Sequence, residues 1–210
     1  MIEVNNITVK IKKDTVLKKV SYNFESGKIY GLRGRNGAGK TMFLRALAGL
    51  IRVNSGSIAV DGQILGEKID FPPSLGLLIE NNNLAPEFSL TKNLKLLSKI
   101  KNVATDDDIA QTITRVGLES TDSRKVAKFS LGMKQRGAIA QALFEKPSLI
   151  LLDEPTNAID QKGVIQIREI LAEEAQRGAT IILASHNPED LNVLADEIID
   201  LSEGEIVTHV

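Results

Sequence analysis

Cysteine is absent from this chain of 210 residues, so neither disulfide bonds nor thiolate metal sites are available to it. This absence is typical of a protein from a reducing cytoplasm. A basic excess is also lacking, because 26 lysines and arginines are balanced by 27 aspartates and glutamates. Proteins dedicated to nucleic acids usually carry a basic excess or a dense basic stripe. We therefore expect no nucleic-acid partner.

Long apolar runs are missing as well. The start of the chain, MIEVNNITVKIKKD, contains no stretch that could serve as a signal peptide. The longest apolar stretches, such as Leu149–Leu152 and Ile181–Ala184, are far shorter than a transmembrane helix. If the protein serves a membrane, it acts from the aqueous side and another chain provides the membrane part.

The composition is that of an ordinary globular protein, with 42% hydrophobic and 25% charged residues. A chain of this length suits one large α/β domain or two small ones. Strand-like and helix-like segments alternate without an internal repeat or a low-complexity linker, and this alternation favours a mainly parallel sheet. We therefore predict a single α/β domain over residues 1–210.

The spacing of apolar residues predicts the individual elements. The expected strands are Ile2–Lys10, Val20–Phe24, Ile29–Leu32, Ser57–Val60, Gln63–Leu65, Leu149–Leu152, Thr180–Ala184, Ile198–Leu201 and Glu205–Val207. The expected helices are Thr41–Leu50, two between Leu90 and Gly117, one after Phe129 and one around Val164–Arg177.

A glycine-rich loop, GRNGAGKT at residues 34–41, follows an expected strand and precedes an expected helix. Its glycines let backbone N–H groups surround a phosphate, and the next helix offers the positive end of its dipole to the same anion. The alternative is a plain glycine-rich turn, but the strand and helix on either side favour nucleotide binding. Lys40 would reach the β- and γ-phosphates, and Thr41 could ligate Mg²⁺. The expected nucleotide contacts are Arg35, Asn36, Gly37, Ala38, Gly39, Lys40, Thr41 and Met42.

Two adjacent carboxylates, Asp153 and Glu154, end the apolar segment Leu149–Leu152. A buried parallel strand presents its last residues at the carboxyl edge of the sheet, where ligands of such folds bind. Asp153 would hold the metal, and Glu154 would orient or deprotonate the attacking water. The alternative is a strand that merely ends in a turn. Together with the phosphate loop, catalysis explains the pair better.

The segment FSLGMKQR at residues 129–136 resembles the signature motif of the ABC ATPases. Ser130 lies 23 residues before Asp153 and 90 after Lys40, in the order and spacing of that family. Phe129, Leu131 and Met133 replace the usual leucine, glycine and glutamine, whereas Ser and Gly remain at 130 and 132. Asn157–Asp160 resembles the D-loop of the same family, and Ser185-His186 resembles its switch histidine.

The resemblance implies a P-loop NTPase core with a mainly parallel sheet, an N-terminal antiparallel β subdomain and an α-helical subdomain inserted at approximately residues 82–145. It implies hydrolysis of Mg-ATP in a head-to-tail dimer, formed with a second copy or a paralogous subunit. Each ATP would then contact one chain's phosphate loop and the other chain's Ser130 and Gly132. It also implies a separate transmembrane permease and a place at the inner face of the cell membrane.

Four single residues receive roles from the resemblance. His186 would bond the γ-phosphate, and Asp160 would link the two active sites across the dimer. Ile11 occupies the place where an aromatic ring often stacks on adenine, and Glu80 occupies the place of the metal-approaching Q-loop glutamine. The alternatives are a structural histidine, a turn acid and an exposed loop glutamate, and Ser130 could be an ordinary N-cap.

The run Leu75–Glu80, followed by Leu90–Leu94, resembles the ABC ATPases that serve bacitracin-type and lantibiotic-type exporters. We therefore expect a transporter ATPase, with Asn81–Asn93 as the surface that docks on the membrane subunit. One competing function is a soluble ABC ATPase acting on DNA or ribosomes, but such proteins generally have two nucleotide domains, coiled-coil insertions or zinc cysteines. Another is a P-loop kinase or GTPase, which the signature motif and the carboxylate pair disfavour.

Overall fold

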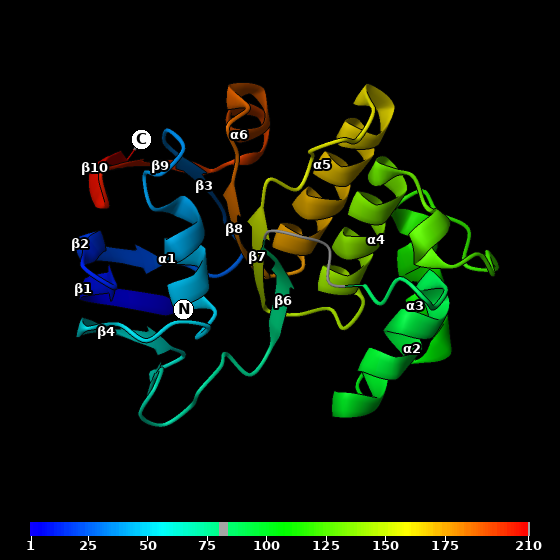
Figure 1. The fold of residues 1–210 in the computed structure, drawn as a ribbon, viewed down its shortest axis with the longest axis horizontal. Helices are drawn as coiled ribbons and strands as arrows, with labels where there is room; N and C mark the ends of the chain where they lie inside the picture. The colour runs from blue at the N-terminus through cyan, green and yellow to red at the C-terminus, as the bar shows by residue number, and fades with distance from the viewer. Residues whose placement is uncertain (80–83, 210) are drawn as a thin grey trace.

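Two β-sheets and a layer of helices make up the computed structural model, which describes residues 1–79 and 84–209 (Figure 1). The smaller sheet has four antiparallel strands in the order β2-β1-β4-β5. Its strands are β1 (Ile2–Ile11), β2 (Asp14–Phe24), β4 (Ser55–Val60) and β5 (Gln63–Ile64). The Asp61-Gly62 turn joins β4 to β5, and both of its residues have positive φ.

The larger sheet has six strands in the order β10-β9-β3-β8-β7-β6. Neighbours from β9 to β6 run parallel, and only β10 is antiparallel to its neighbour. Its strands are β3 (Ile29–Arg33), β6 (Leu75–Leu78), β7 (Leu149–Asp153), β8 (Thr180–Ala184), β9 (Glu197–Ser202) and β10 (Glu205–His209). Consequently β3, β7 and β8 all end at one edge of this sheet.

Both faces of the larger sheet are covered, which explains the continuous apolar sequences of its central strands. Along β7, Ile150 and Leu152 enter one hydrophobic core, whereas Leu149 and Leu151 enter a second core on the other face. Helix α1 (Lys40–Leu47) belongs to the second core and lies between the two sheets.

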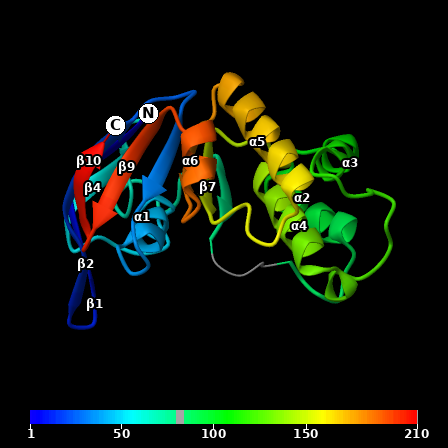
Figure 2. The same ribbon diagram turned by 90° about the horizontal axis from the view of Figure 1, so that it is seen from above.

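The remaining helices contribute to the first core and lie on the far side of the larger sheet from α1 (Figure 2). They are α2 (Leu90–Lys101), α3 (Asp106–Arg115), α4 (Leu131–Leu143), α5 (Gln161–Gln176) and α6 (Pro188–Leu194), with a 3₁₀ turn at Val126–Lys128 before α4. Among the helices of the described residues, none has the length and apolar character required to cross a membrane.

The predicted α/β fold class is confirmed, and the structure adds two elements that the sequence analysis missed. Strand β6 was missed because it has four residues and shows no alternation of polar and apolar side chains. Helix α6 was missed because it has only seven residues, although Pro188 at its first turn and the N-cap Asn187 are recognised start signals. The first helix ends at Leu47 rather than Leu50, since Gly49 adopts a positive φ of 75°.

We predict that Phe24→Ala lowers the free energy of unfolding by about 3–5 kcal/mol. Phe24 is fully buried, and its ring lies 4.9 Å from that of Tyr30 and 6.1 Å from that of Phe43, so it connects β2 to β3 and α1. Urea unfolding provides the measurement. Phe71→Ala is the matched control, because Phe71 is exposed and its loss should cost no more than about 0.5 kcal/mol. Equal losses in the two variants would contradict this view of the core.

Candidate nucleotide-binding and catalytic site

The glycine-rich loop connects the end of β3 to the start of α1, as predicted. Gly39, the N-cap of α1, has φ of 108°, a conformation that side chains with a Cβ rarely adopt. A Cβ at this position would also lie 2.9 Å from the carbonyl oxygen of Val16. The loop therefore requires glycine here both for its backbone path and for its contact with β2.

Lys40 lies against the loop that precedes it and is almost completely buried. Its Nζ donates hydrogen bonds to the carbonyl oxygens of Gly34 at 2.7 Å and Arg35 at 3.3 Å. These bonds hold the ammonium group at the start of α1, inside the loop. A positive charge in this place, beside the positive end of a helix dipole, suits the phosphates of a nucleotide.

Thr41 and Asp153 meet at the carboxyl edge of the larger sheet. The Thr41 hydroxyl donates a hydrogen bond of 2.6 Å to Oδ2 of Asp153, although 112 residues separate them. Thr41 belongs to the first turn of α1, and Asp153 is the last residue of β7. Two of the three side chains assigned to a metal from the sequence therefore lie in direct contact.

Glu154 and His186 form a second pair beside the first. Glu154 accepts hydrogen bonds from the backbone N–H of His186 at 2.9 Å and pairs with its Nδ1 at 2.7 Å. Glu154 has a positive φ of 50°, and its own N–H donates to the carbonyl oxygen of Ala184 at 2.8 Å. A non-glycine residue in this region costs free energy, and such strain is concentrated at functional sites. The chain thus holds Glu154 in an unfavourable conformation that directs its carboxylate to His186.

A cavity of about 600 Å³ brings most of the predicted residues together. The predicted residues that line it are Ile11, Asn36, Gly37, Ala38, Gly39, Lys40, Thr41, Met42, Asp153 and Glu154. Lys12, Asp14 and Val16 line it too, from the β1–β2 hairpin, and the sequence analysis missed them. Their position in the sequence could have indicated this, because they follow closely after Ile11, which was itself a predicted contact.

Three predicted residues, Arg35, His186 and Glu80, lie beside this cavity or outside the residues that the structure describes. Arg35 lines an adjacent cavity of about 440 Å³ together with Asn36 and His186, so the two cavities share Asn36. Glu80, predicted to approach the metal, lies outside the described residues.

Ser130 and Gly132 lie away from the phosphate loop of their own chain. They are at the start of α4, which contributes to the core on one face of the larger sheet, whereas α1 contributes to the core on the other. The Ser130 hydroxyl accepts a hydrogen bond of 3.2 Å from the N–H of Met133 and so caps α4. A Cβ at Gly132 would lie 2.7 Å from the carbonyl oxygen of Ala158, so this glycine lets α4 approach the loop after β7.

Two side chains of α4 that received no role from the sequence connect it to the catalytic loops. Gln135 donates from Nε2 to the carbonyl oxygens of Glu154 and Pro155, both at 3.0 Å. Arg136 donates to Asp160 at 2.8 Å, which places the D-loop residue in an ion pair within its own chain. The sequence did offer a signal for them, because they are the last two residues of the segment that resembles the signature motif.

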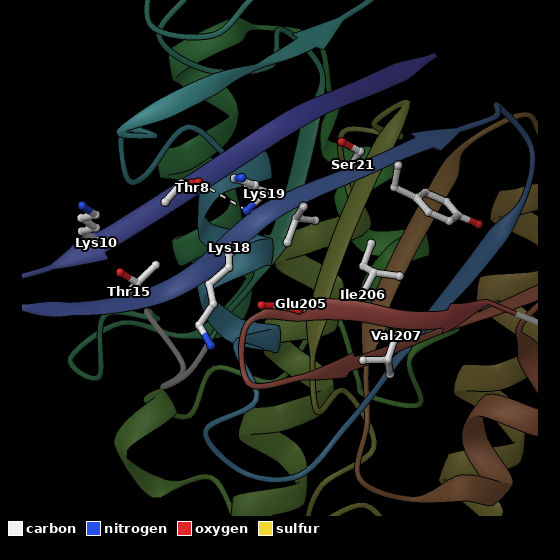
Figure 3. A pocket seen from close by; sticks show the side chains of 11 residues that line it. Thr8, Lys10, Thr15, Lys18, Lys19, Ser21, Glu205, Ile206 and Val207 are labelled. Carbon is white, nitrogen blue, oxygen red and sulfur yellow. Dashed lines mark hydrogen bonds between the residues drawn. The ribbon is translucent and has the colours of Figure 1, made fainter.

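The largest of the described cavities, about 930 Å³, lies elsewhere (Figure 3). It is a groove between β2 and β10, the edge strands of the two sheets. A hydrogen bond of 2.8 Å from the N–H of Lys18 on β2 to the carbonyl oxygen of Gly204, in the turn before β10, connects the two sheets. Lys10, Lys18 and Lys19 line the groove together with threonine and serine hydroxyls. The described lining includes neither the phosphate loop nor the carboxylate pair.

Comparison with known proteins gives consistent matches over nearly the whole chain. The family model described as ABC transporter matches residues 17–157. The "Uncharacterized ABC transporter ATP-binding protein YybJ" of Bacillus subtilis (strain 168) is 58% identical over 208 residues, which cover 99% of this chain and 95% of that protein. The "Lantibiotic transport ATP-binding protein SrtF" of Streptococcus pyogenes is 37% identical and is covered to 89%. The "Bacitracin transport ATP-binding protein BcrA" of Enterococcus faecalis is 34% identical and is covered to 69%.

A solved structure shares the fold. The chain superimposes on the "Dimeric Structure of MJ0796, a Bacterial ABC Transporter Cassette" with a TM-score of 0.89. The match covers 100% of this chain and 98% of the other, at 24% sequence identity. At this level of identity the likeness concerns the fold.

We predict that Lys40→Ala weakens the binding of a nucleoside triphosphate about 10- to 150-fold, since a hydrogen bond to a charged group contributes about 1.5–3 kcal/mol. Isothermal titration calorimetry with ATP provides the measurement. Lys12→Ala is the matched control, because Lys12 lines the same cavity from the exposed hairpin turn. Its loss should cost less than about 1 kcal/mol. Unchanged affinity in the Lys40 variant would contradict the assignment of the loop.

Proposed function

This chain belongs to the ABC transporter family, and we propose that its ATPase activity powers export through a separate permease. It is the ATP-binding subunit of a transporter and hydrolyses ATP. The main support for the proposed site is that Thr41, Asp153 and Glu154 all line the cavity beside the phosphate loop. Two relatives are named for lantibiotic and bacitracin transport, which favours a peptide antibiotic as the exported substrate.

The donor set beside the phosphate loop fits Mg²⁺. Thr41 and Asp153 offer a hydroxyl and a carboxylate 2.6 Å apart, and such hard oxygen atoms are the ligands that Mg²⁺ prefers. The described residues contain no cluster of three or more histidine, cysteine or acidic side chains suited to a metal. This agrees with Mg²⁺, which binds through one or two protein oxygens together with phosphate and water. When bound, Mg²⁺ would neutralise charge on the β- and γ-phosphates.

The protein side chains have separate tasks in hydrolysis. Lys40 and the loop amides bind the phosphates, and the N–H of His186 and its Nδ1 both hold the carboxylate of Glu154. Glu154 so held would accept the proton of the attacking water. His186 has an exposed side chain, so it can reach the γ-phosphate at the mouth of the site.

A head-to-tail dimer accounts for the position of Ser130 and Gly132. They lie at the start of α4, on the opposite side of the larger sheet from α1, and neither is among the residues that line the nucleotide cavity of their own chain. The exposed side chain of Leu131 leaves this helix start accessible. We propose that it faces the ATP of a second copy or of a paralogous subunit. Residues at about 82–145, including α2 to α4, would form the subdomain that carries it.

The permease surface that we propose comprises four exposed apolar side chains, those of Phe71, Leu96, Ile100 and Val103. Lys101 Nζ donates a hydrogen bond of 3.0 Å to the carbonyl oxygen of Pro73, which brings the end of α2 next to the segment that carries Phe71. Exposed apolar patches mark protein interfaces, and a permease would present a cytoplasmic segment to this one. A subunit docked on a permease in this way would lie at the inner face of the cell membrane. The earlier expectation of docking at Asn81–Asn93 lies partly outside the described residues.

We predict that Glu154→Gln reduces ATP hydrolysis by about 10²–10⁴-fold, because the amide cannot accept the proton of the attacking water. ATP affinity should remain close to that of the wild type, and a stable ATP-bound dimer should accumulate. Phosphate release and size-exclusion chromatography with ATP provide the two measurements. Normal turnover in this variant would remove Glu154 from the mechanism.

We predict that Ile100→Glu reduces co-purification with the co-expressed permease at least about tenfold, which corresponds to about 1.4 kcal/mol. A charge buried in an apolar interface without a partner is costly. ATP hydrolysis by the isolated subunit should not change. Val207→Glu is the matched control, because Val207 is similarly exposed but belongs to β10. Retained co-purification of the Ile100 variant would exclude α2 from the interface.

A further inference from the structure

Asp190 is a buried acidic residue that lies close to the catalytic pair and has no role in the mechanism above. It belongs to α6 and is only 1% exposed, whereas its neighbour Glu189 has a side chain that is 71% exposed. A buried carboxylate is costly unless it is paired and hydrogen-bonded. The hydrogen-bond partners of the Asp190 carboxylate therefore indicate its role.

The first partner connects Asp190 to the loop that carries Glu154. Thr156, two residues after Glu154, donates its hydroxyl proton to Oδ2 of Asp190 at 2.5 Å. The N–H of Glu154 is bonded to Ala184, so the strained backbone of Glu154 is held on both sides. The bond from Thr156 thus anchors the loop directly after the catalytic carboxylate.

The second partner connects Asp190 to the loop that carries His186. The hydroxyl of Ser185 lies 3.5 Å from Oδ2 of Asp190 and also accepts a hydrogen bond of 3.0 Å from the N–H of Asn187. Both neighbours of His186 are therefore held, one directly and the other through Ser185. The same carboxylate oxygen serves the two loops that meet at the Glu154–His186 pair.

The third partner balances the charge of Asp190. Arg168, on α5, donates from Nε at 3.1 Å and from Nη2 at 2.7 Å to Oδ1. It also pairs with Glu189 at 3.1 Å. Burial works against the charge of Arg168, but the hydrogen bonds to Asp190 and Glu189 raise the pKa of its guanidinium above the ordinary value. Arg168 therefore remains a cation and makes a buried Asp190 carboxylate tolerable.

We propose that Asp190 is a positioning residue, which joins the loops after β7 and β8 so that Glu154 and His186 stay in contact. This inference rests on the proposed role of that pair in hydrolysis. Asp190 itself contacts neither the nucleotide cavity nor the pair. It acts through Thr156 and Ser185, and its effect should appear in the chemical step rather than in ATP binding.

The test compares Asp190→Asn with Glu189→Gln. Both variants remove one carboxylate that pairs with Arg168, but only the first alters the bonds to Thr156 and Ser185. We expect Asp190→Asn to lower kcat about 10- to 100-fold, because a misplaced catalytic group typically slows a reaction by up to about this factor. The KM for ATP should remain unchanged within about twofold. Glu189→Gln should retain the wild-type kcat. An equal loss in both variants would overturn the proposal.

A second pair of variants avoids any dependence on the buried charge. Thr156→Val keeps the shape of the side chain but removes the hydroxyl donor, and it should lower kcat as Asp190→Asn does. Thr156→Ser retains the donor and should restore most of the wild-type rate. Wild-type kcat in a folded Thr156→Val protein would overturn the proposal.

A spectroscopic measurement separates this inference from the proposed function. The sequence contains only two histidines, so the ring ¹⁵N signals of His186 can be assigned with a His186→Ala variant. These signals should shift in Asp190→Asn and Thr156→Val but not in Glu189→Gln. Unchanged signals in the first two variants would overturn the inference even if the wild type hydrolyses ATP. Conversely, absence of ATPase in the wild type would count against the proposed function, while the signals still test the positioning role.

Discussion

The parallel pairing of β3, β8 and β7 is the constraint on which the rest of the structure depends. Because the three strands run in one direction with matched registers, the phosphate loop, the carboxylate pair and His186 all follow strands that end at the same edge. The hydrogen bond between Thr41 and Asp153 connects the helix after the phosphate loop directly to the carboxylate pair. The apolar side chains on both faces of β7 make this arrangement stable, since each face has its own core.

The same sheet separates the two halves of the nucleotide site. The phosphate loop leads into α1 on one face, and Ser130 begins α4 on the other. This separation supports the proposed dimer, in which the two motifs that face one nucleotide come from different chains. Within the chain, Gln135 bonds the backbone carbonyl oxygen of Glu154 and Arg136 bonds the side chain of Asp160, so α4 is connected directly to the loop after β7.

Most of the fold and of the proposed site could be predicted because the relevant signals are local. The apolar run of β7 ends in Asp153 and Glu154, and the glycine loop has a strand before it and a helix after it. The family and the fold class inferred from these motifs are confirmed by the comparisons. Elements with weak local signals, β6 and α6, were missed because they are short and are stabilised mainly by tertiary packing.

The sequence by itself determined the chemistry, since the order and spacing of the phosphate loop, the signature motif and the carboxylate pair depend only on which residue follows which. Only the tertiary structure decided which of these groups touch. The contacts between Glu154 and His186, between Arg136 and Asp160, and between Thr156 and Asp190 join residues that are 32, 24 and 34 positions apart. Such contacts arise when strands and helices pack against a common sheet. No local pattern encodes them, because the distance between two distant residues depends on every element that packs between them.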